Sequence, residues 1–523
     1  MSRKPHPGFM LRNYRIALLF SLLLTILSST NVAAQTINIL HFSDYHSNAV
    51  PTANSDGIQV GGIARLIHLL RQEDSANTLI FSGGDMMNKG SPAWSDKYQC
   101  AEWPWFNGLL DAMALGNHES DYGADVFSEC QTATDYPIIS SNVLLPSGAP
   151  LLSRDGKDYL VYAIDSIKIG VISLAGPDFV NLLKPATLPA PGVSFADRIE
   201  TAKKLVSTLK DIEKVDAVVL IGHAHYEDDI QLAQQVDGID LILGTHSHRK
   251  QELMQIENTK TWYISPFQYL SHVSKVSLRF EEGQLRQISG GLIALDENIP
   301  EDPETAEKVA NMQAALEKDP LYAHKFKILG DNPSPLSAPT KFDGESILGN
   351  FVTDLVRAQS KANVVLMTSS TFRKSIPAGT IKEYHLTDAL PYENKIFIHE
   401  LSGKQLEKLL NYSVSRSGSD FFSQVSGARF AIEAGAAGDI KIRTPAGSWR
   451  ALDPMATYQV ATSDFQSLYA DGYKQFFIDS DYQALPDSLW TLVRKHLRSP
   501  VSMSKSPALL DGRIKNLDVV DKP

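Results

Sequence analysis

Short apolar runs alternate with longer stretches of mixed polarity from residue 35 to about residue 290. Continuous runs of β-branched residues and leucine are typical of strands that are covered on both faces. These runs are 37–40, 78–81, 168–172, 217–221 and 239–243. Two of the intervening stretches, 64–73 and 196–212, carry apolar residues at the three-to-four spacing of an amphipathic helix. Strands that alternate with helices predict a layered α/β domain.

The pattern changes after residue 300. Residues 301–318 are polar, with a few apolar residues at helical spacing and Pro303 near the start, where a helix tolerates proline. They predict an exposed linking helix, and the helices 347–359 and 401–414 follow beyond a proline-containing loop. We therefore expect a first domain, a linker and a second domain, with the bounds 35–300, 301–325 and 326–523.

Residues 1–34 have the layout of a secretory signal peptide. Four basic residues precede an apolar stretch at 16–27. Val32, Ala33 and Ala34 then supply the small residues that a signal peptidase accepts. A membrane anchor is the alternative, but the apolar stretch is shorter than the ~20 residues that a membrane span needs. We expect cleavage, export to the periplasm or the medium, and no stable membrane insertion.

Composition narrows the class of protein further. The chain has 523 residues, 43% of them apolar, which excludes disorder throughout. Its net charge of −11 argues against binding of nucleic acid polymers, which requires a basic surface. Cys100 and Cys130 are the two cysteines, and in an exported chain we expect them to form a disulfide. Two buried free thiols are the alternative.

Potential metal ligands stand where the apolar runs of the first domain end. The open crevice of an α/β sheet lies outside the carboxyl ends of its strands, so these side chains are predicted to converge there. They are Asp44 and His46, then Asp85, then Asn117 with His118, Glu119 and Asp121, then His223, and finally His246 and His248. Within the pairs 44/46 and 246/248, the side chains project to one side if the backbone is extended.

Seven of these groups are counted as ligands, which is too many for one ion of coordination number four to six. They are Asp44, His46, Asp85, Asn117, His223, His246 and His248. Two ions that share one carboxylate fit better, and such pairs suit the displacement at a phosphate ester. Imidazole, carboxylate and amide oxygen together suit zinc, manganese or iron, with zinc or manganese favoured. Any one of the histidines alone is more often not a ligand; coincidence at all seven positions is the alternative.

The ordered set Asp-x-His, Gly-Asp, Gly-Asn-His-Glu, Gly-His and Gly-x-His-x-His resembles the calcineurin-like metallophosphoesterases. The more detailed pattern, including the segment Gly-Asn-His-Glu-Ser-Asp-Tyr-Gly at 116–123, resembles the secreted bacterial 5′-nucleotidase/UDP-sugar hydrolase family. This resemblance implies a four-layer α/β/β/α metallophosphoesterase domain, joined by a linking helix to a smaller α/β C-terminal domain that binds substrate.

The resemblance also assigns roles to the residues of the first domain. One ion is held by Asp44, His46, Asp85 and His248, and the other by Asp85, Asn117, His223 and His246, with Asp85 bridging the two. His118 is the catalytic imidazole, and Asp121 orients it. His225 stands where the family usually has glycine; an exposed side chain is favoured there over a group behind the ligands.

The second domain matches the family less well. The resemblance implies that Tyr392 and Phe465 sandwich a nucleobase; without the resemblance, both would rather be taken as core aromatics. Asn394 and Asp471 belong to the same segments, and Arg373 stands where the family has an arginine that suits phosphate. The asparagine and glycines expected before that arginine are missing, as are upstream arginines, for which Lys341 is a candidate substitute.

These observations together predict an exported dimetal phosphoesterase. It would hydrolyse 5′-nucleotides to nucleoside and phosphate through a metal-activated hydroxide, with protonated His118 assisting the leaving oxygen. UDP-sugars, cyclic nucleotides or another phosphoester remain alternative substrates, and a thiosulfate-ester hydrolase is an alternative enzyme. A non-catalytic nucleotide-binding protein is the alternative outside enzymes. No feature of the sequence indicates a protein partner.

Overall fold

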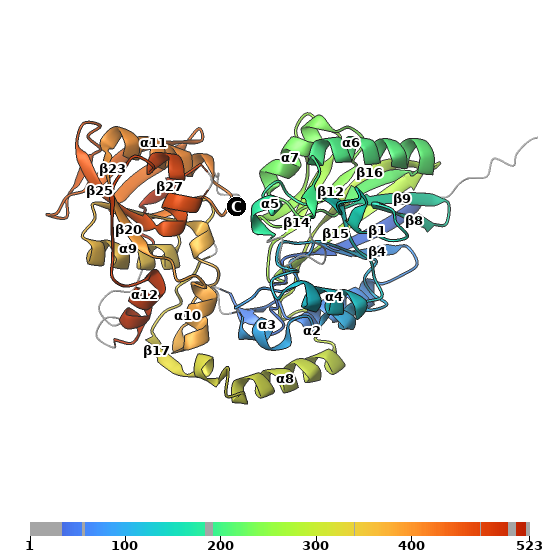
Figure 1. Cartoon of the computed structure of the whole chain (residues 1–523), viewed down its shortest axis with the longest axis horizontal. Helices are drawn as coiled ribbons and strands as arrows, with labels where there is room; N and C mark the ends of the chain where they lie inside the picture. Colours follow the sequence, from blue (N-terminus) through green and yellow to red (C-terminus); the bar gives the residue numbers. More distant parts are fainter. Residues whose placement is uncertain are drawn as a thin grey trace, which may run out of the picture.

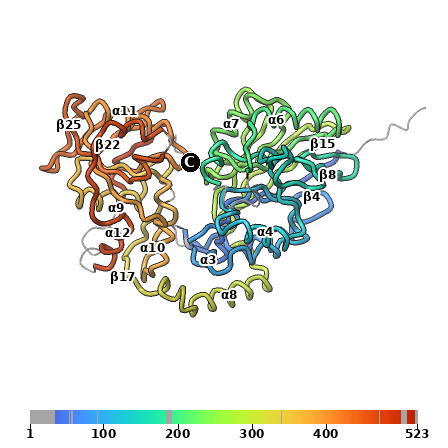
Figure 2. The backbone as a smooth tube through the Cα atoms, in the orientation of Figure 1, coloured from blue at the N-terminus to red at the C-terminus, as the bar shows by residue number. Residues whose placement is uncertain are grey.

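The computed structural model describes residues 34–54, 58–90, 92–183, 192–338, 340–470, 472–499 and 509–518. The predicted signal peptide lies outside these residues, apart from Ala34. The chain forms two lobes that face each other, and helix α8 (Pro303–Lys318) runs beneath them (Figures 1 and 2). No helix in the described ranges is long and apolar enough to cross a membrane.

Two mixed sheets form the centre of the first lobe. The first has the order β10-β6-β5-β4-β1-β15-β16, with β7 paired to β6, and the second has the order β13-β14-β12-β11-β9-β8. The strands of the first sheet are β1 (Gln35–Phe42), β4 (Thr78–Ser82), β5 (Ala112–Ala114), β6 (Ile138–Leu144), β7 (Pro150–Leu152), β10 (Ser194–Phe195), β15 (His272–Glu281) and β16 (Gln284–Ala294). Those of the second are β8 (Tyr159–Ile164), β9 (Ile167–Ile172), β11 (Ala217–Leu220), β12 (Leu241–Leu243), β13 (Lys250–Gln255) and β14 (Trp262–Pro266). The short strands β2 (Thr52–Ala53) and β3 (Gln59–Val60) pair with each other.

Three apolar clusters separate the layers of this lobe. Along β1, Ile37 and Ile39 point into a cluster shared with the second sheet, whereas Leu40 and Phe42 point to the opposite side. The helices on the outer face of the first sheet are α2 (Ile63–Glu73), α3 (Ala93–Tyr98) and α4 (Ala124–Thr132). Helices α6 (Arg198–Ser207) and α7 (Tyr226–Gln235) cover the second sheet. The predicted α/β/β/α layering is therefore confirmed.

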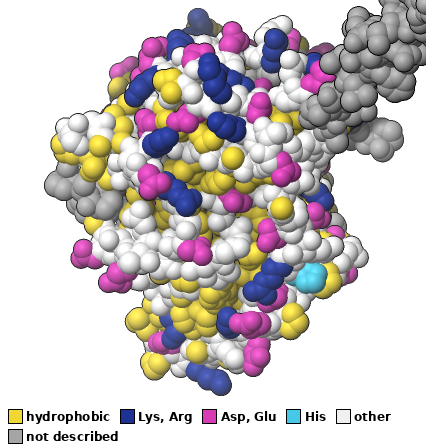
Figure 3. All heavy atoms as spheres, turned by 90° about the vertical axis from the view of Figure 1, so that its right-hand side faces the viewer, with side chains coloured by type: hydrophobic (Ala, Val, Ile, Leu, Met, Phe, Trp, Pro, Cys, Tyr) yellow, Lys and Arg dark blue, Asp and Glu magenta, His cyan; other side chains and the backbone are white. Residues whose placement is uncertain are grey.

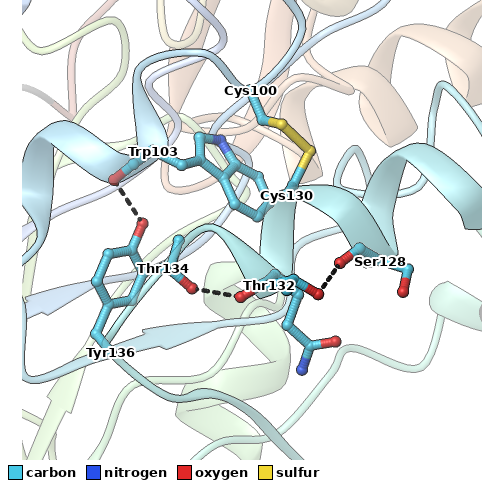
Figure 4. The surroundings of a disulfide bond; sticks show 8 residues. Cys100, Trp103, Ser128, Cys130, Thr132, Thr134 and Tyr136 are labelled. Carbon is cyan, nitrogen blue, oxygen red and sulfur yellow. Dashed lines mark hydrogen bonds between the residues drawn. A yellow bond between two sulfur atoms is a disulfide. The ribbon is translucent and has the colours of Figure 1, made fainter.

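A disulfide joins Cys100 to Cys130 of α4. Their Cα atoms lie 5.8 Å apart, within the ordinary range for such a bond. Trp103 lies beside the bridge, and its carbonyl accepts a hydrogen bond of 3.2 Å from the hydroxyl of Tyr136 (Figure 4). The bridge closes a segment that contains residues 116–121, so the expected pairing is confirmed and it encloses the loop that follows β5.

Replacing both cysteines by serine is expected to destabilise the first lobe. The bridge spans a sequence separation of 30, and closing a loop of this size is worth about 3–4 kcal/mol in the unfolded chain. For a domain of this size we expect the Tm to fall by roughly 5–10 °C. Calorimetry of the double variant, compared with the wild type under oxidising and reducing conditions, checks this. A Tm that is equal in all four samples would contradict a stabilising role.

Helix α8 is docked on the first lobe rather than fully exposed. Val309 and Leu316 are buried in the cluster under the first sheet, and the hydroxyl of Tyr98 donates a 2.6 Å hydrogen bond to the carbonyl of Met312. Asp302 caps the helix by accepting from the backbone N–H of Thr305. The prediction of an exposed helix was therefore wrong for one of its faces, and the connection between the lobes begins after α8.

The second lobe contains a sheet with the order β21-β18-β25-β20-β26 and a smaller sheet with the order β24-β23-β22-β27. Alternate residues of β18 point into different apolar clusters, so the main sheet is covered on both faces. The strands are β17 (Ile328–Asn332), β18 (Val364–Thr368), β19 (Gly379–Lys382), β20 (Ile396–Ser402), β21 (Ser423–Ser426), β22 (Ala428–Glu433), β23 (Ala436–Arg443), β24 (Trp449–Ala451), β25 (Thr457–Ser463), β26 (Tyr482–Ala484) and β27 (Ile514–Asn516). The helices are α9 (Ile347–Ser360), α10 (Glu383–Ala389), α11 (Gly403–Ser415) and α12 (Leu489–Leu497).

Charges of both signs are interspersed over the outer face of the first lobe (Figure 3). Several pair with each other, such as Lys157 with Glu213 at 2.8 Å and Lys203 with Glu200 at 2.9 Å. An interspersed surface of this kind gives solubility without a strong field of one sign.

Candidate metal centre

The candidate ligands of the first lobe lie in loops that follow β1, β4, β5, β11 and β12. Their backbone is unusual, because five of these non-glycine residues have positive φ values between 47° and 56°: Asp44, His46, Asp85, His246 and His248. The backbone of the two i, i+2 pairs is therefore not extended, so the condition under which alternation alone would align their side chains is not met. Left-handed turns aim these side chains instead, and such local strain is typical of functional sites.

Asp44, His46 and His248 form the first group of converging atoms. The Nε2 atoms of His46 and His248 lie 3.0 Å apart, and Oδ1 of Asp44 lies 3.3 Å from Nε2 of His248. All three residues are almost fully buried. The three polar atoms face one another from two different loops.

A second group lies directly beside the first. Nε2 of His223 lies 3.2 Å from Oδ2 of Asp85 and 3.1 Å from Nδ1 of His246. Oδ2 of Asp85 also lies 3.7 Å from Nε2 of His46. Asp85 therefore stands between the two groups, in the place that a shared ligand would occupy.

The groups have the spacing and the chemistry of a divalent cation site. Ligands at roughly 2.0–2.2 Å from an ion lie roughly 3–3.5 Å from one another, which matches the shorter separations here. Within the described part of the chain, Oδ1 of Asp44 and Oδ1 of Asn117 are buried without a hydrogen-bond partner. Buried acceptors without a partner are rare and call for an explanation such as a bound ion. The residues present therefore fit divalent metal ions.

Neighbouring groups fix the orientation of the ligands. Nδ1 of His223 lies 2.6 Å from the carbonyl oxygen of Gly83, so the proton belongs on Nδ1 and Nε2 is left free. The backbone N–H groups of Asp85 and Met86 donate to the buried carboxyl of Glu119 at 3.1 and 2.6 Å. Burial alone raises the pKa of Asp85, but His223 and His118 outweigh it and hold that pKa well below its usual range. Asp85 is thus an ionised carboxylate.

His118 stands at the edge of this cluster. Its ring centroid is 5.1 Å from that of His46, and its Nδ1 lies 2.7 Å from Oδ2 of Asp121. Burial lowers the pKa of His118, but the carboxylates of Asp85 and Asp121 outweigh burial and raise it to about 9. The imidazole is therefore protonated near neutral pH in the absence of ions.

The second lobe contributes Arg373 and Tyr392 to the same place. Nη1 of Arg373 lies 3.2 Å from Nδ1 of His248, and Nη2 donates a 3.0 Å hydrogen bond to the hydroxyl of Tyr392. Asp420 lies 3.6 Å from the guanidinium. A cation and an aromatic ring from one lobe thus face the histidine cluster of the other.

Comparison with known proteins identifies both lobes. The family described as calcineurin-like phosphoesterase matches residues 37–250, and the family described as 5′-nucleotidase, C-terminal domain, matches residues 325–477. The chain therefore combines a calcineurin-like phosphoesterase domain with a 5′-nucleotidase C-terminal domain. This chain is a metal-dependent phosphoric-ester hydrolase.

The relatives described below are identical to this chain at about a quarter of the aligned positions. The trifunctional nucleotide phosphoesterase protein YfkN of Bacillus subtilis (strain 168) is 26% identical over 92% of this chain, which spans 35% of that protein. The 5′-nucleotidase of Vibrio vulnificus (strain CMCP6) is 26% identical, with 84% of this chain and 85% of the relative covered. A solved structure, the 5′-nucleotidase precursor from Thermus thermophilus, has a TM-score of 0.70 at 24% identity, covers 94% of this chain and all of its own, and shows the same fold.

The candidate substrate-binding residues other than Arg373 differ in position and exposure. The segments of Tyr392 and Phe465 are side by side, because Lys395 and Asp464 exchange hydrogen bonds of 2.9 and 3.1 Å. Tyr392 is 43% exposed, whereas Phe465 is half-buried against the apolar cluster under α11. The carbonyl of Asn394 accepts from the N–H of Leu489. Asp471 lies outside the described residues.

Two expectations for polar residues around the centre were wrong. Lys341 was a candidate substitute for a phosphate-binding arginine, but its ammonium is buried and donates to the carbonyls of Ser369 and Phe372 at 3.0 and 2.6 Å. His225 was expected to be exposed, yet its Nε2 lies 3.2 Å from Oδ2 of Asp178. The Lys341 ammonium therefore binds backbone carbonyls of its own lobe, and the His225 ring lies against the Asp178 carboxylate.

Sequence reasoning missed Glu119 and Asp178. Glu119 was noted within its motif without a role, although it holds the backbone of the bridging position. Asp178 follows the apolar run at 168–172 after a glycine and a proline. It thus obeys the rule that located the other candidates, and that rule was not applied to this strand.

Proposed function

We propose that this chain hydrolyses nucleoside 5′-monophosphates to nucleoside and phosphate with two divalent ions, zinc or manganese, held by the two groups of ligands. The observation that carries the proposal is the position of Asp85 between the groups, 3.7 Å from His46 and 3.2 Å from His223. Asp44, His46, Asp85 and His248 would hold one ion, and Asp85, Asn117, His223 and His246 the other. When bound, such a pair lowers the pKa of coordinated water and neutralises the phosphoryl oxygens.

His118 has the environment of a proton donor to the leaving oxygen. Its Nδ1 is held by Asp121, so Nε2 is the nitrogen available to a bound phosphoester. Without bound ions, the carboxylates of Asp85 and Asp121 raise its pKa, and a general acid must carry this proton. Asp121 therefore orients the ring and favours its charged form.

Arg373 and Tyr392 would hold the substrate across the cleft between the lobes. A guanidinium fork matches the oxygens of a phosphate, and Arg373 already lies 3.2 Å from a candidate ligand of the metal centre. The partly exposed ring of Tyr392 offers a stacking surface for a base, with Phe465 on the neighbouring segment. The family resemblance adds Asn394 and Asp471 as candidates for recognition of the base, although Asp471 lies outside the described residues.

We also propose that the chain acts in the periplasm or outside the cell. Its disulfide is of the kind that persists in an oxidising compartment, and the basic and apolar start of the sequence has the layout of a signal peptide. Fractionation of cells that produce the full chain, followed by N-terminal sequencing, tests this. Intact chain that stays in the cytosol would contradict it.

The test of function is phosphate release from AMP and from bis-p-nitrophenyl phosphate, with and without a chelator. Release from AMP that stops with chelator and returns with Zn²⁺ or Mn²⁺ supports the proposal. Release from the diester alone would replace the nucleotidase by a phosphodiesterase. Full binding of AMP without release from either compound would show a nucleotide-binding protein instead.

Replacing Tyr392 by alanine is expected to raise the KM for AMP by about 5- to 150-fold, since base stacking is worth about 1–3 kcal/mol. The KM for p-nitrophenyl phosphate, which lacks a nucleobase, should change much less. Steady-state kinetics with both substrates measures the difference. Tyr392→Phe is the matched control, because it keeps the ring and removes only the hydroxyl that accepts from Arg373. Equal effects on both substrates would mean that Tyr392 is structural.

A further inference from the structure

Asp178 brings a carboxylate to the back of the metal centre. It follows β9 and precedes the short helix α5 (Phe179–Leu182), at the edge of the first lobe that faces the second (Figure 1). Its Oδ2 lies 2.9 Å from Nε2 of His246. Its side chain is 27% exposed, and that of His246 is 11% exposed.

The two ring nitrogens of His246 face different partners. Nδ1 points to the cluster, 3.1 Å from Nε2 of His223, so Nδ1 is the nitrogen that can bind an ion. A neutral imidazole that offers the lone pair of Nδ1 has its proton on Nε2. That proton points at Asp178, at an ordinary hydrogen-bond distance.

We propose that Asp178 is the positioning residue of His246, and that it fixes the tautomer and ring orientation that His246 needs to hold the second ion. The inference rests on the metal centre of the proposed function and adds a residue outside the seven ligands. Carboxylates behind ligating histidines raise the basicity of the ligand and restrict its rotation. Within this centre, the carbonyl of Gly83 has the equivalent position behind His223.

The surroundings of Asp178 are built to hold it in place. Nε2 of His225 lies 3.2 Å from the same Oδ2, and the rings of His225 and His246 are 4.3 Å apart. A Cβ atom at Gly176 would lie 2.6 Å from Oδ1 of Asp178, so glycine leaves the room that this carboxylate occupies. Phe421 of the second lobe covers the outer side of His225, with ring centroids 6.0 Å apart.

An additional ion among Asp178, His225 and His246 is the competing explanation. Their candidate ligand atoms all lie within 4.8 Å of one another. It would require His246 to bind one ion through each nitrogen as an anionic imidazolate. The positioning role needs only a neutral ring, and it accounts for the 2.9 Å contact directly.

Metal binding by the full-length protein tests the proposal without relying on activity. Zn²⁺ is titrated in competition with a chromogenic chelator, and the ions per chain are counted by elemental analysis. For Asp178→Ala we expect the affinity of one of the two sites to fall about 10- to 100-fold, and that of the other to change little. Asp178→Asn should lose less, because its amide oxygen still accepts the proton of His246.

Two further variants separate positioning from charge and from misfolding. Gly176→Ala keeps every charge but pushes the carboxylate aside, so it should weaken the same site. Asp228→Asn is the matched control, because it removes a charge from the neighbouring helix α7 and leaves the contact with His246 in place; its affinities should equal those of the wild type. Circular dichroism establishes that each variant is folded.

The outcomes that overturn the inference differ from those that overturn the proposed function. Two unchanged sites in folded Asp178→Ala would exclude the positioning role. Three ions in the wild type, one of them lost in both Asp178→Ala and His225→Ala, would replace it by an additional metal site. A wild type that binds two ions but releases no phosphate from any ester would refute the proposed function and leave this inference standing.

Discussion

The variant Asp85→Ala is expected to lose both metal ions and nearly all hydrolysis. Asp85 lies between the two groups of ligands, 3.2 Å from His223 and 3.7 Å from His46, so its removal takes one ligand from each ion. Metal ions supply several kcal/mol of transition-state stabilisation, which corresponds to a loss of about 10³-fold or more in kcat/KM. Elemental analysis of the purified variant and phosphate release from AMP measure the two effects.

The control for this variant is Asp211→Ala, which removes an exposed carboxylate from the helical segment Thr208–Glu213, outside the proposed ligand set. It should retain two ions and full activity. Two ions per chain in folded Asp85→Ala would contradict the bridging role. Loss of the ions without loss of hydrolysis would contradict metal-dependent catalysis by this centre.

The variant His118→Ala is expected to keep both ions and to lose turnover. His118 lies next to His46 and Asp85, but its Nδ1 is held by Asp121 and it is not one of the seven proposed ligands, so its loss should leave the seven ligand positions intact. General acid catalysis contributes about 10²- to 10⁴-fold, and kcat should fall within that range while metal content stays constant. Loss of one ion in this variant would show that His118 is a ligand instead.

The pH dependence gives a second check on His118. A proton donor is active below its pKa, so hydrolysis should decline as the pH rises through that value. The pKa is raised to about 9 by Asp85 and Asp121 against the effect of burial, and bound cations lower it from there. Asp121→Asn removes one of the two carboxylates, so the alkaline decline should move to lower pH. A profile that does not move would exclude Asp121 as the group that favours the charged form.

The apolar periodicity was sufficient to predict a layered α/β domain for the first lobe, whereas its arrangement in two sheets was implied only by the family resemblance. The runs at 37–40 and 168–172 are β1 and β9, and both are buried on two sides, as continuous runs require. The ends of the helices were harder to predict from the sequence. Residues 401 and 402 were assigned to a helix, but they belong to β20, and Ser402 caps the helix that follows. A cap residue after an apolar strand looks like the first turn of a helix when only periodicity is used.

The identity of the candidate ligands came from the sequence, but the way in which they converge did not. The sequence suggested a common direction for Asp44 and His46 only on condition of an extended backbone, whereas both have positive φ. Such conformations are stabilised by tertiary contacts, here the hydrogen bond from the N–H of His46 to the carbonyl of Asp85. The surroundings of Lys341 and His225 could not be predicted for the same reason, because the residues that they contact lie far away in the sequence.

The bridge between Cys100 and Cys130 encloses both Asn117 and His118. A recombinant chain that matures under reducing conditions would reach its final topology without this covalent closure. Batches prepared in the two ways would then differ in heat resistance while sharing one amino-acid sequence. The oxidation state of the thiols is therefore a variable to fix before the specific activities of any two preparations are compared.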